Sequence, residues 1–264
     1  MAARGAATTP TEQFDEIVVF SPHCDDVPLS LGGAILGKTL STRVTVEVVF
    51  SLSRYSLSHS VTEDVAKVTE TRHSEELAAA KMAGYKVHFM GFPEPFVRHG
   101  YRTFREVFDG SRPVRYDPIW PSVRAALRFR VSTTHGLVLC PLRCGHHIDH
   151  RIVFESVVAF CRTMPRPLIG FYEDLPYAAW LRDSEISSLV PDLPSGPLQP
   201  ITIANIPFGA KAALLDSYPS QLTAQDIESV FAHWTRRGGE RLWLSPAVIH
   251  AFFSQTRPSK PLSV

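Results

Sequence analysis

Residues 16–20 read EIVVF and run directly into the polar segment SPHCDD, residues 21–26. A short apolar run without alternation is typical of a strand that is buried on both faces of a parallel sheet. Residues 29–40 then predict a helix, with Gly32 and Gly33 near its start. A strand, a polar turn and a helix in this order predict the first half of a βαβ unit.

The same alternation of apolar strands and helices continues along the chain. Further strands are expected at residues 43–50, 86–90, 136–140, 167–172 and 201–206. Helices are expected at residues 61–83, 118–130, 149–162, 209–217 and 224–233. This order predicts an α/β fold, in which a single domain has a Rossmann-like, mostly parallel sheet with helices on both faces. We expect a flexible N-terminal arm, the domain itself and a C-terminal tail at residues 1–13, 14–254 and 255–264.

Composition excludes several classes of protein. Of the 264 residues, 44% are hydrophobic and 20% are charged, which rules out a disordered or collagen-like chain. The net charge of +1 gives no electrostatic sign of nucleic acid or of a membrane as a partner. No run approaches the roughly 20 apolar residues of a membrane span, and residues 1–15 lack the apolar stretch of a signal peptide. With only four cysteines, the chain is expected in the reducing cytoplasm, and a homo-oligomer is compatible with these numbers.

Two clusters of histidine and aspartate follow two of the expected strands. The first is SPHCDD at residues 21–26, and the second is GHHIDH at residues 145–150. The carboxyl ends of parallel strands lie at one edge of a sheet, where α/β proteins place their sites. We therefore expect the two clusters to meet at that edge.

The residue types in these clusters suit a metal-dependent hydrolase. Histidine is the commonest metal ligand, and the chain has 11 histidines. A catalytic zinc site needs three protein ligands and one open position, which His23, one aspartate of the first cluster and one histidine of the second can supply. The other aspartate can then act as general base. Spacing alone leaves the second cluster open, because His146 and His147 both share a helix face with His150.

A second motif suggests a different class of protein. Residues 32–39, GGAILGKT, match the pattern GxxxxGK[ST] of P-loop NTPases. A P-loop follows its strand directly, whereas residues 23–31 intervene here, and the apolar residues 34–36 are typical of a helix. Asp25 and Asp26 would also repel phosphate. The P-loop is the weaker interpretation, and an esterase or another amide hydrolase built on the same histidine and aspartate clusters stays open.

The motifs resemble those of the PIG-L/LmbE-like family of zinc-dependent N-deacetylases. The family's His-Pro-Asp-Asp stretch and Gly-Gly helix start are matched by residues 23–26 and 32–33, and its His-x-Asp-His motif by residues 147–150. Family-like segments also occur at Arg72, Glu75, Ala79, Ala80, Gly84, residues 171–177 and residues 218–221. The resemblance runs from about residue 17 to residue 221. Cys24 replaces the family's Pro and Val27 its Glu, and neither position is a ligand or base in the family scheme.

The resemblance implies a role for each matched residue. The expected zinc ligands are His23, Asp26 and His150, with one ion per chain. The expected catalytic residues are Asp25 as general base and later acid, His147 as oxyanion donor and Asp149 as the residue that orients a histidine. The expected substrate-binding residues are Arg72 and, by a weaker match, Glu94.

The implied reaction removes an N-acetyl group from a soluble N-acetylated amino sugar or a related glycosylated metabolite, releasing acetate and a free amine. The sequence also shows two long irregular stretches, residues 91–117 and 175–200, which are typical of binding loops. Arginines in the first stretch are candidates for an anion-binding site or for paired surface charges. These arginines are Arg98, Arg102, Arg105, Arg112 and Arg115.

Overall fold

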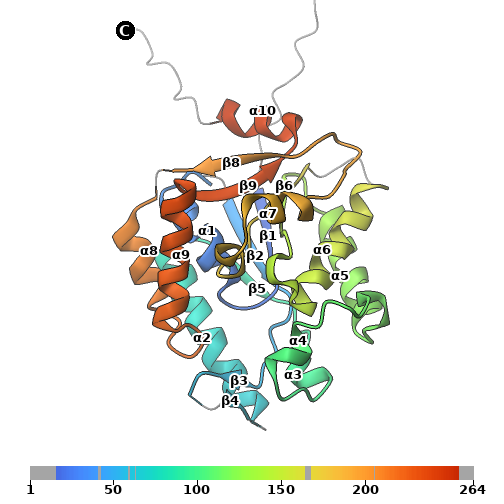
Figure 1. The fold of residues 1–264 in the computed structure, drawn as a ribbon, viewed down its shortest axis with the longest axis vertical. Coiled ribbons are helices and arrows are strands. Elements are labelled where there is room, and N and C mark those ends of the chain that lie inside the picture. Colours follow the sequence, from blue (N-terminus) through green and yellow to red (C-terminus); the bar gives the residue numbers. More distant parts are fainter. Residues whose placement is uncertain are drawn as a thin grey trace, which may run out of the picture.

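A seven-stranded sheet forms the centre of the computed structural model, which describes residues 16–40, 43–58, 60–62, 64–163, 168–204 and 206–255 (Figure 1). The strand order is β5-β2-β1-β6-β7-β9-β8. The bounds are β1 Glu16–Ser21, β2 Arg43–Val48, β5 Lys86–Phe89, β6 Leu137–Pro141, β7 Leu168–Tyr172, β8 Gln199–Ile203 and β9 Glu240–Leu244. Strands β5 to β7 of this order pair in parallel, whereas β9 is antiparallel to both of its neighbours. The predicted fold class is confirmed.

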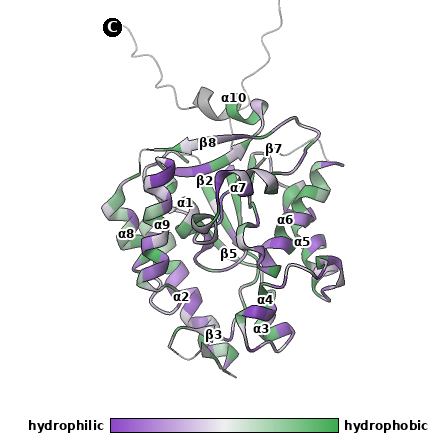
Figure 2. Cartoon of the chain, in the orientation of Figure 1, coloured by the Kyte–Doolittle hydropathy of each residue, from purple (hydrophilic) through white to green (hydrophobic). Residues whose placement is uncertain are grey.

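Helices cover both faces of the sheet because β1 is apolar on both sides. Val18 and Phe20 pack in one core with α5 and α6, whereas Ile17 and Val19 pack in a second core with α1. Figure 2 shows green, hydrophobic colour on strands in the middle of the sheet and purple along α2 and α9. The main helices are α1 Asp26–Leu36, α2 Val65–Ala83, α5 Trp120–Ser132, α6 Ile148–Cys161, α8 Phe208–Leu215, α9 Ala224–Arg237 and α10 Pro246–Gln255. None of the described helices is long and apolar enough to span a bilayer.

Several elements differ from the sequence expectation. Strand β9 and helix α10 were not predicted, because β9 begins with the charged Glu240 and Arg241 and lacks the alternation of a surface strand. The two stretches expected to be irregular contain short helices. Shorter elements are β3 Tyr55–Ser56, β4 Ser60–Val61, α3 Pro95–Arg98, α4 Phe104–Val107, η1 Val114–Tyr116, η2 Cys144–His146, η3 Tyr177–Trp180 and α7 Asp183–Leu189. The expected arm, residues 1–13, and all of the expected tail but Gln255 lie outside the described residues.

Helix α1 excludes the P-loop interpretation. Residues 32–36 lie within this helix rather than in an open loop. The backbone amides of Gly33 and Ala34 donate to the carboxylate of Glu240 at 2.9 and 2.7 Å. Lys211 pairs with the same carboxylate, and both side chains are buried. The amides that would hold a phosphate in a P-loop are therefore occupied by a carboxylate of the chain itself.

The strand order places a potential site at the carboxyl end of β1. The chain leaves β1 through α1 and returns on one side as β2, while β6 pairs with β1 on the other side. In open α/β sheets, such a reversal leaves a crevice above the strand ends. The segments that follow β1 and β6 therefore lie next to each other.

Candidate active site

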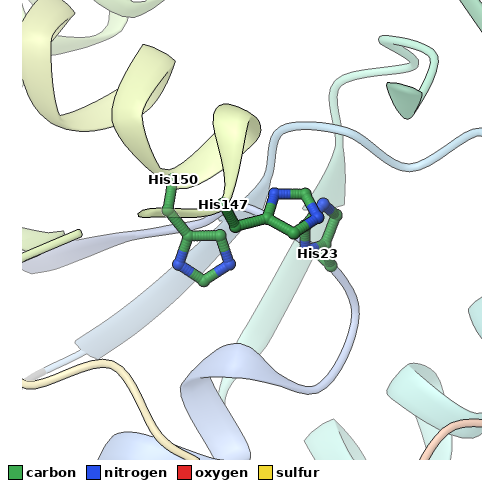
Figure 3. A group of neighbouring side chains, drawn as sticks. All are labelled: His23, His147 and His150. Atoms are coloured by element: carbon green, nitrogen blue, oxygen red, sulfur yellow. The ribbon is translucent and has the colours of Figure 1, made fainter. Parts of the chain in front are cut away.

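The histidine and aspartate clusters meet above the ends of β1 and β6. Residues 22–25 connect β1 to α1, and Asp26 is the first residue of α1. His147 and His150 lie at the start of α6. Figure 3 shows the imidazoles of His23, His147 and His150 close together, although they come from distant parts of the sequence.

Buried nitrogen and oxygen atoms converge at this point. The ligand atoms of His23, His147 and His150 all lie within 4.8 Å of one another. Asp26 adds its carboxylate, with Oδ2 3.4 Å from Nδ1 of His23 and Oδ1 3.4 Å from Nε2 of His150. The structure therefore brings together the three residues that the resemblance implied as ligands, and it places His147 beside them.

The environment of His150 tests whether this group fits a metal ion. Its Nδ1 lies 2.8 Å from Oδ2 of Asp174, and the side chain is fully buried. Its Nε2 is buried without a hydrogen-bond partner among the described residues. Metal-binding histidines show this arrangement, in which a carboxylate holds one ring nitrogen and leaves the other free for the metal. Asp174 was not expected from the sequence to have a role, although it lies just beyond the end of β7, next to β6.

His23 is held in the same way by Asp149. The distance between Nε2 of His23 and Oδ2 of Asp149 is 2.9 Å, which leaves Nδ1 toward Asp26. Burial lowers the pKa of His23, but hydrogen bonds to Asp149 and Asp26 outweigh this effect and raise the pKa to about 10. The surrounding carboxylates thus favour positive charge at this point, which a bound cation supplies as well as a proton does.

Arg98 holds Asp149 from its other side. Its guanidinium lies 2.7 Å from Oδ1 of Asp149 and 2.9 Å from Oδ2 of Asp117, and Asp117 also contacts Nε2 of His99 at 2.9 Å. Arg98, a candidate for an anion-binding site, is instead buried and paired with Asp149 and Asp117. A pocket is lined by His23, Asp25 and Asp26, and none of the five arginines of residues 91–117 is among the described residues that line it.

Asp25 has an unusual backbone conformation. Its φ is 113° and its ψ is −33°, a region that non-glycine residues rarely adopt. Its amide donates to Oε2 of Glu76 at 3.2 Å, and Glu76 also accepts from the hydroxyls of Tyr85 and Tyr218 at 2.8 Å each. Backbone strain of this kind persists where surrounding contacts enforce it, often at functional sites. Sequence analysis missed Glu76, although it lies one helical turn from Arg72 on the same face of α2.

The two adjacent aspartates differ in charge preference. Burial and the neighbouring Asp26 raise the pKa of Asp25 well above its usual range. Burial also raises the pKa of Asp26, but His150 and His23 outweigh this effect and lower it overall. Neighbouring acids whose pKa values move apart commonly divide the proton-transfer and charge-holding roles between them.

His147 presents a hydrogen-bond donor to the pocket. Its Nδ1 accepts from the amide of Asp149 at 3.1 Å, so the neutral ring carries its proton on Nε2. Burial, together with repulsion from His23 and His150, lowers the pKa of His147 well below its usual value. The side chain can therefore donate a hydrogen bond without being charged.

A pocket of about 400 Å³ opens onto these residues. Arg72 and Glu94, the expected substrate-binding residues, both line it. They pair with each other, with NH1 of Arg72 2.6 Å from Oε1 of Glu94, and both contact the hydroxyl of Ser53. The pocket thus has a polar end, where an amide and sugar hydroxyls would find partners.

The fold and the pocket are those of an α/β protein with a hydrolase-type site, and sequence comparison identifies its family. The family model for PIG-L, GlcNAc-PI de-N-acetylase, matches residues 18–161. This is more than half of the chain, which therefore belongs to the PIG-L family. Members of the family that resemble this chain are deacetylases, so the chain is an amide hydrolase of the deacetylase class.

One relative and two solved structures are similar to this chain. The chain is 27% identical over 229 residues to 2'-N-acetylparomamine deacetylase of Streptomyces fradiae, covering 86% of this chain and 80% of that protein. A deacetylase of teicoplanin biosynthesis shares the fold with a TM-score of 0.67 at 21% identity, covering 86% of this chain and 96% of that one. A zinc inhibited form of teicoplanin deacetylase Orf2 has a TM-score of 0.64 at 20% identity, covering 86% and 97%.

Proposed function

We propose that the protein is a zinc-dependent hydrolase that removes an N-acetyl group from an N-acetylated amino sugar or a related glycosylated metabolite in the cytoplasm. The observation that supports this most is the convergence of His23, Asp26 and His150 beside Asp25. The free Nε2 of His150 and the carboxylates behind both histidines suit a divalent cation.

His23, Asp26 and His150 would hold one zinc ion, and its charge would be partly balanced by Asp26. When bound, zinc polarises an amide carbonyl and makes water more acidic. The buried carboxylates of Asp149 and Asp174 keep the two imidazoles in the required orientation. Arg98 in turn fixes Asp149.

The proton transfers belong to Asp25. It lines the pocket and takes a proton from the attacking water, and it later gives that proton to the leaving amine. The carbonyl oxygen gains negative charge in the tetrahedral intermediate, and Nε2–H of His147 donates a hydrogen bond to it. The carbon–nitrogen bond then breaks, so one amide and one water give acetate and an amine.

Arg72 and Glu94 would bind the sugar. Their carboxylate and guanidinium lie at the polar end of the pocket, where they can accept from and donate to hydroxyl groups. Because they pair with each other, they offer hydrogen bonds without adding a net charge.

The experiment that tests this function combines metal analysis with acetate release from a panel of N-acetylated and O-acetylated sugars. We expect bound zinc and acetate from the N-acetyl compounds. Acetate from the O-acetyl compounds alone would identify an esterase instead. A zinc-loaded protein that releases no acetate from any N-acetyl substrate would disprove the proposal.

Replacing Asp174 with alanine is expected to lower zinc affinity by about 10- to 100-fold, because Asp174 orients the His150 ring. Competition with a chromogenic chelator measures this affinity. The control is Asp192→Ala, which removes an exposed carboxylate. Equal affinity in the parent and in Asp174→Ala would show that His150 is not held for a metal.

A further inference from the structure

Aromatic side chains form the wall of the pocket beyond its polar end. The six rings, which we call the aromatic arc, are those of Tyr55, Phe96, Phe104, Phe108, Tyr177 and Trp180. Phe96, Phe104 and Phe108 belong to the stretch 91–117, and Tyr177 and Trp180 belong to the stretch 175–200. The two long stretches that the sequence suggested as binding loops therefore bring aromatic rings to the pocket.

Ring contacts connect the members of the aromatic arc from Trp180 to Tyr55. Trp180 contacts Tyr177 at a ring distance of 6.0 Å, and Tyr177 contacts Phe108 at 5.6 Å. Phe108 then leads to Phe104 at 6.2 Å, and Phe104 to Tyr55 at 4.8 Å.

The aromatic arc also touches the polar site. Phe108 lies edge-on to His147 at 5.2 Å, and Tyr177 lies edge-on to His150 at 5.4 Å. A group bound along the arc is thus connected to the place where the amide would be cleaved.

Two aromatic side chains of the arc are largely exposed in the free protein. Trp180 is 61% exposed and Phe104 is 46% exposed, and Leu57 on the same pocket lining is 37% exposed. Large apolar side chains gathered on the rim of a pocket are typical of a ligand-binding surface. Burying them against an apolar group would add binding free energy, because apolar area leaves water.

Charges around the arc favour a neutral partner. Among the described lining residues outside the site of the two clusters, Arg72 and Glu94 pair with each other. Asp226 is the remaining acid on this lining, so beyond the polar site the lining offers a single further carboxylate, whose Oδ2 also accepts from the amide and hydroxyl of Thr223. A substrate with several ammonium groups would find little to compensate its charges there.

The pocket has room for more than a small sugar. A volume of about 400 Å³ lies in the range of pockets that enclose drug-sized ligands. The acetamide and sugar hydroxyls would use the polar end, where Arg72, Glu94 and Asp25 lie. What remains is an apolar, ring-lined space that suits a flat aromatic group, because aromatic pairs prefer offset and edge-to-face contacts.

Building on the proposed deacetylase function, we propose that the substrate is an N-acetylated amino sugar carrying an aromatic group, and that the aromatic arc binds this group. Trp180 and Phe104 are then specificity-determining residues for the deacetylation. They act through contact with the aromatic group and leave the bond-breaking step to the polar site.

The test compares kcat/KM for acetate release from N-acetylglucosamine, 4-nitrophenyl N-acetylglucosaminide and 2'-N-acetylparomamine. We expect the nitrophenyl glycoside to exceed N-acetylglucosamine by about tenfold or more, mainly through a lower KM. Trp180→Ala and Phe104→Ala should each divide this ratio by a factor of about two to ten. The control is Phe129→Ala, which removes a ring that is 70% exposed on α5, away from the pocket, and should keep the ratio.

The outcomes separate the two proposals. A nitrophenyl ratio near one, a ratio unchanged in both arc variants, or a preference for the cationic 2'-N-acetylparomamine would overturn the role of the aromatic arc while leaving the deacetylase function intact. No acetate from any of the three compounds by the zinc-loaded protein would overturn the deacetylase function itself.

Discussion

Replacing Asp25 with asparagine is expected to lower kcat for acetate release by about 1,000-fold while the protein still binds zinc. Asparagine has nearly the same shape as aspartate but cannot take a proton from water. The expected metal ligand of this pair is Asp26, whose oxygens lie between His23 and His150. Zinc content by mass spectrometry and kcat with one N-acetyl sugar measure both parts of the prediction.

Asparagine is the preferred substitution because of the backbone at Asp25. Its φ of 113° is tolerated by asparagine better than by most other residues, so the variant should keep the local fold. Asp192→Asn, at an exposed position, is the matched control and should keep the parent kcat. If Asp25→Asn turned over within a few-fold of the parent, the general base would have to be another residue.

Replacing His150 with alanine is expected to abolish both zinc binding and acetate release. The change removes the Nε2 atom that faces Asp26 and also leaves the buried carboxylate of Asp174 without its partner. We expect zinc affinity to fall by more than the roughly 10- to 100-fold that loss of an orienting residue causes. Calorimetric titration with zinc measures this loss.

Loss of zinc binding in His150→Ala has to be distinguished from loss of folding. His150→Gln is a second variant that offers an amide to Asp174, and circular dichroism compares its fold and that of His150→Ala with the parent. His135→Ala removes an exposed imidazole and should change neither zinc binding nor turnover. A folded His150→Ala protein that binds one zinc ion with parental affinity would contradict the assigned ligand set.

The position of the site could be predicted from the sequence because it depends on local order. The residues before Asp26 follow an apolar strand directly, and residues 145–150 follow another, so the edge of a parallel sheet had to bring them together. The paired motifs added the expected roles by resemblance to a family. Neither step required knowledge of side-chain packing.

The residues that support the site could not be predicted in this way. Glu76 on α2 contacts Asp25, and Arg98 at the end of α3 contacts Asp149. Each contact depends on how two distant segments pack, which local periodicity does not record. Glu240 is similar, because its carboxylate accepts from an amide of α1, and this contact depends on the pairing of β9 with β7 and β8.

The aromatic arc shows the same limit on a larger scale. Its rings are spread over residues 55–180, and the sequence marks only that two stretches are long and irregular. The charge of the arginines in the first stretch suggested a binding site, but its aromatic residues Phe96, Phe104 and Phe108 line the pocket instead.

The most direct test of the account is a zinc titration of protein stripped with a chelator, followed by acetate release from an N-acetylated amino sugar. The account predicts no activity in the stripped protein and a rise that is complete at one zinc ion per chain. Full acetate release by the stripped protein, with zinc verified as absent, would contradict it.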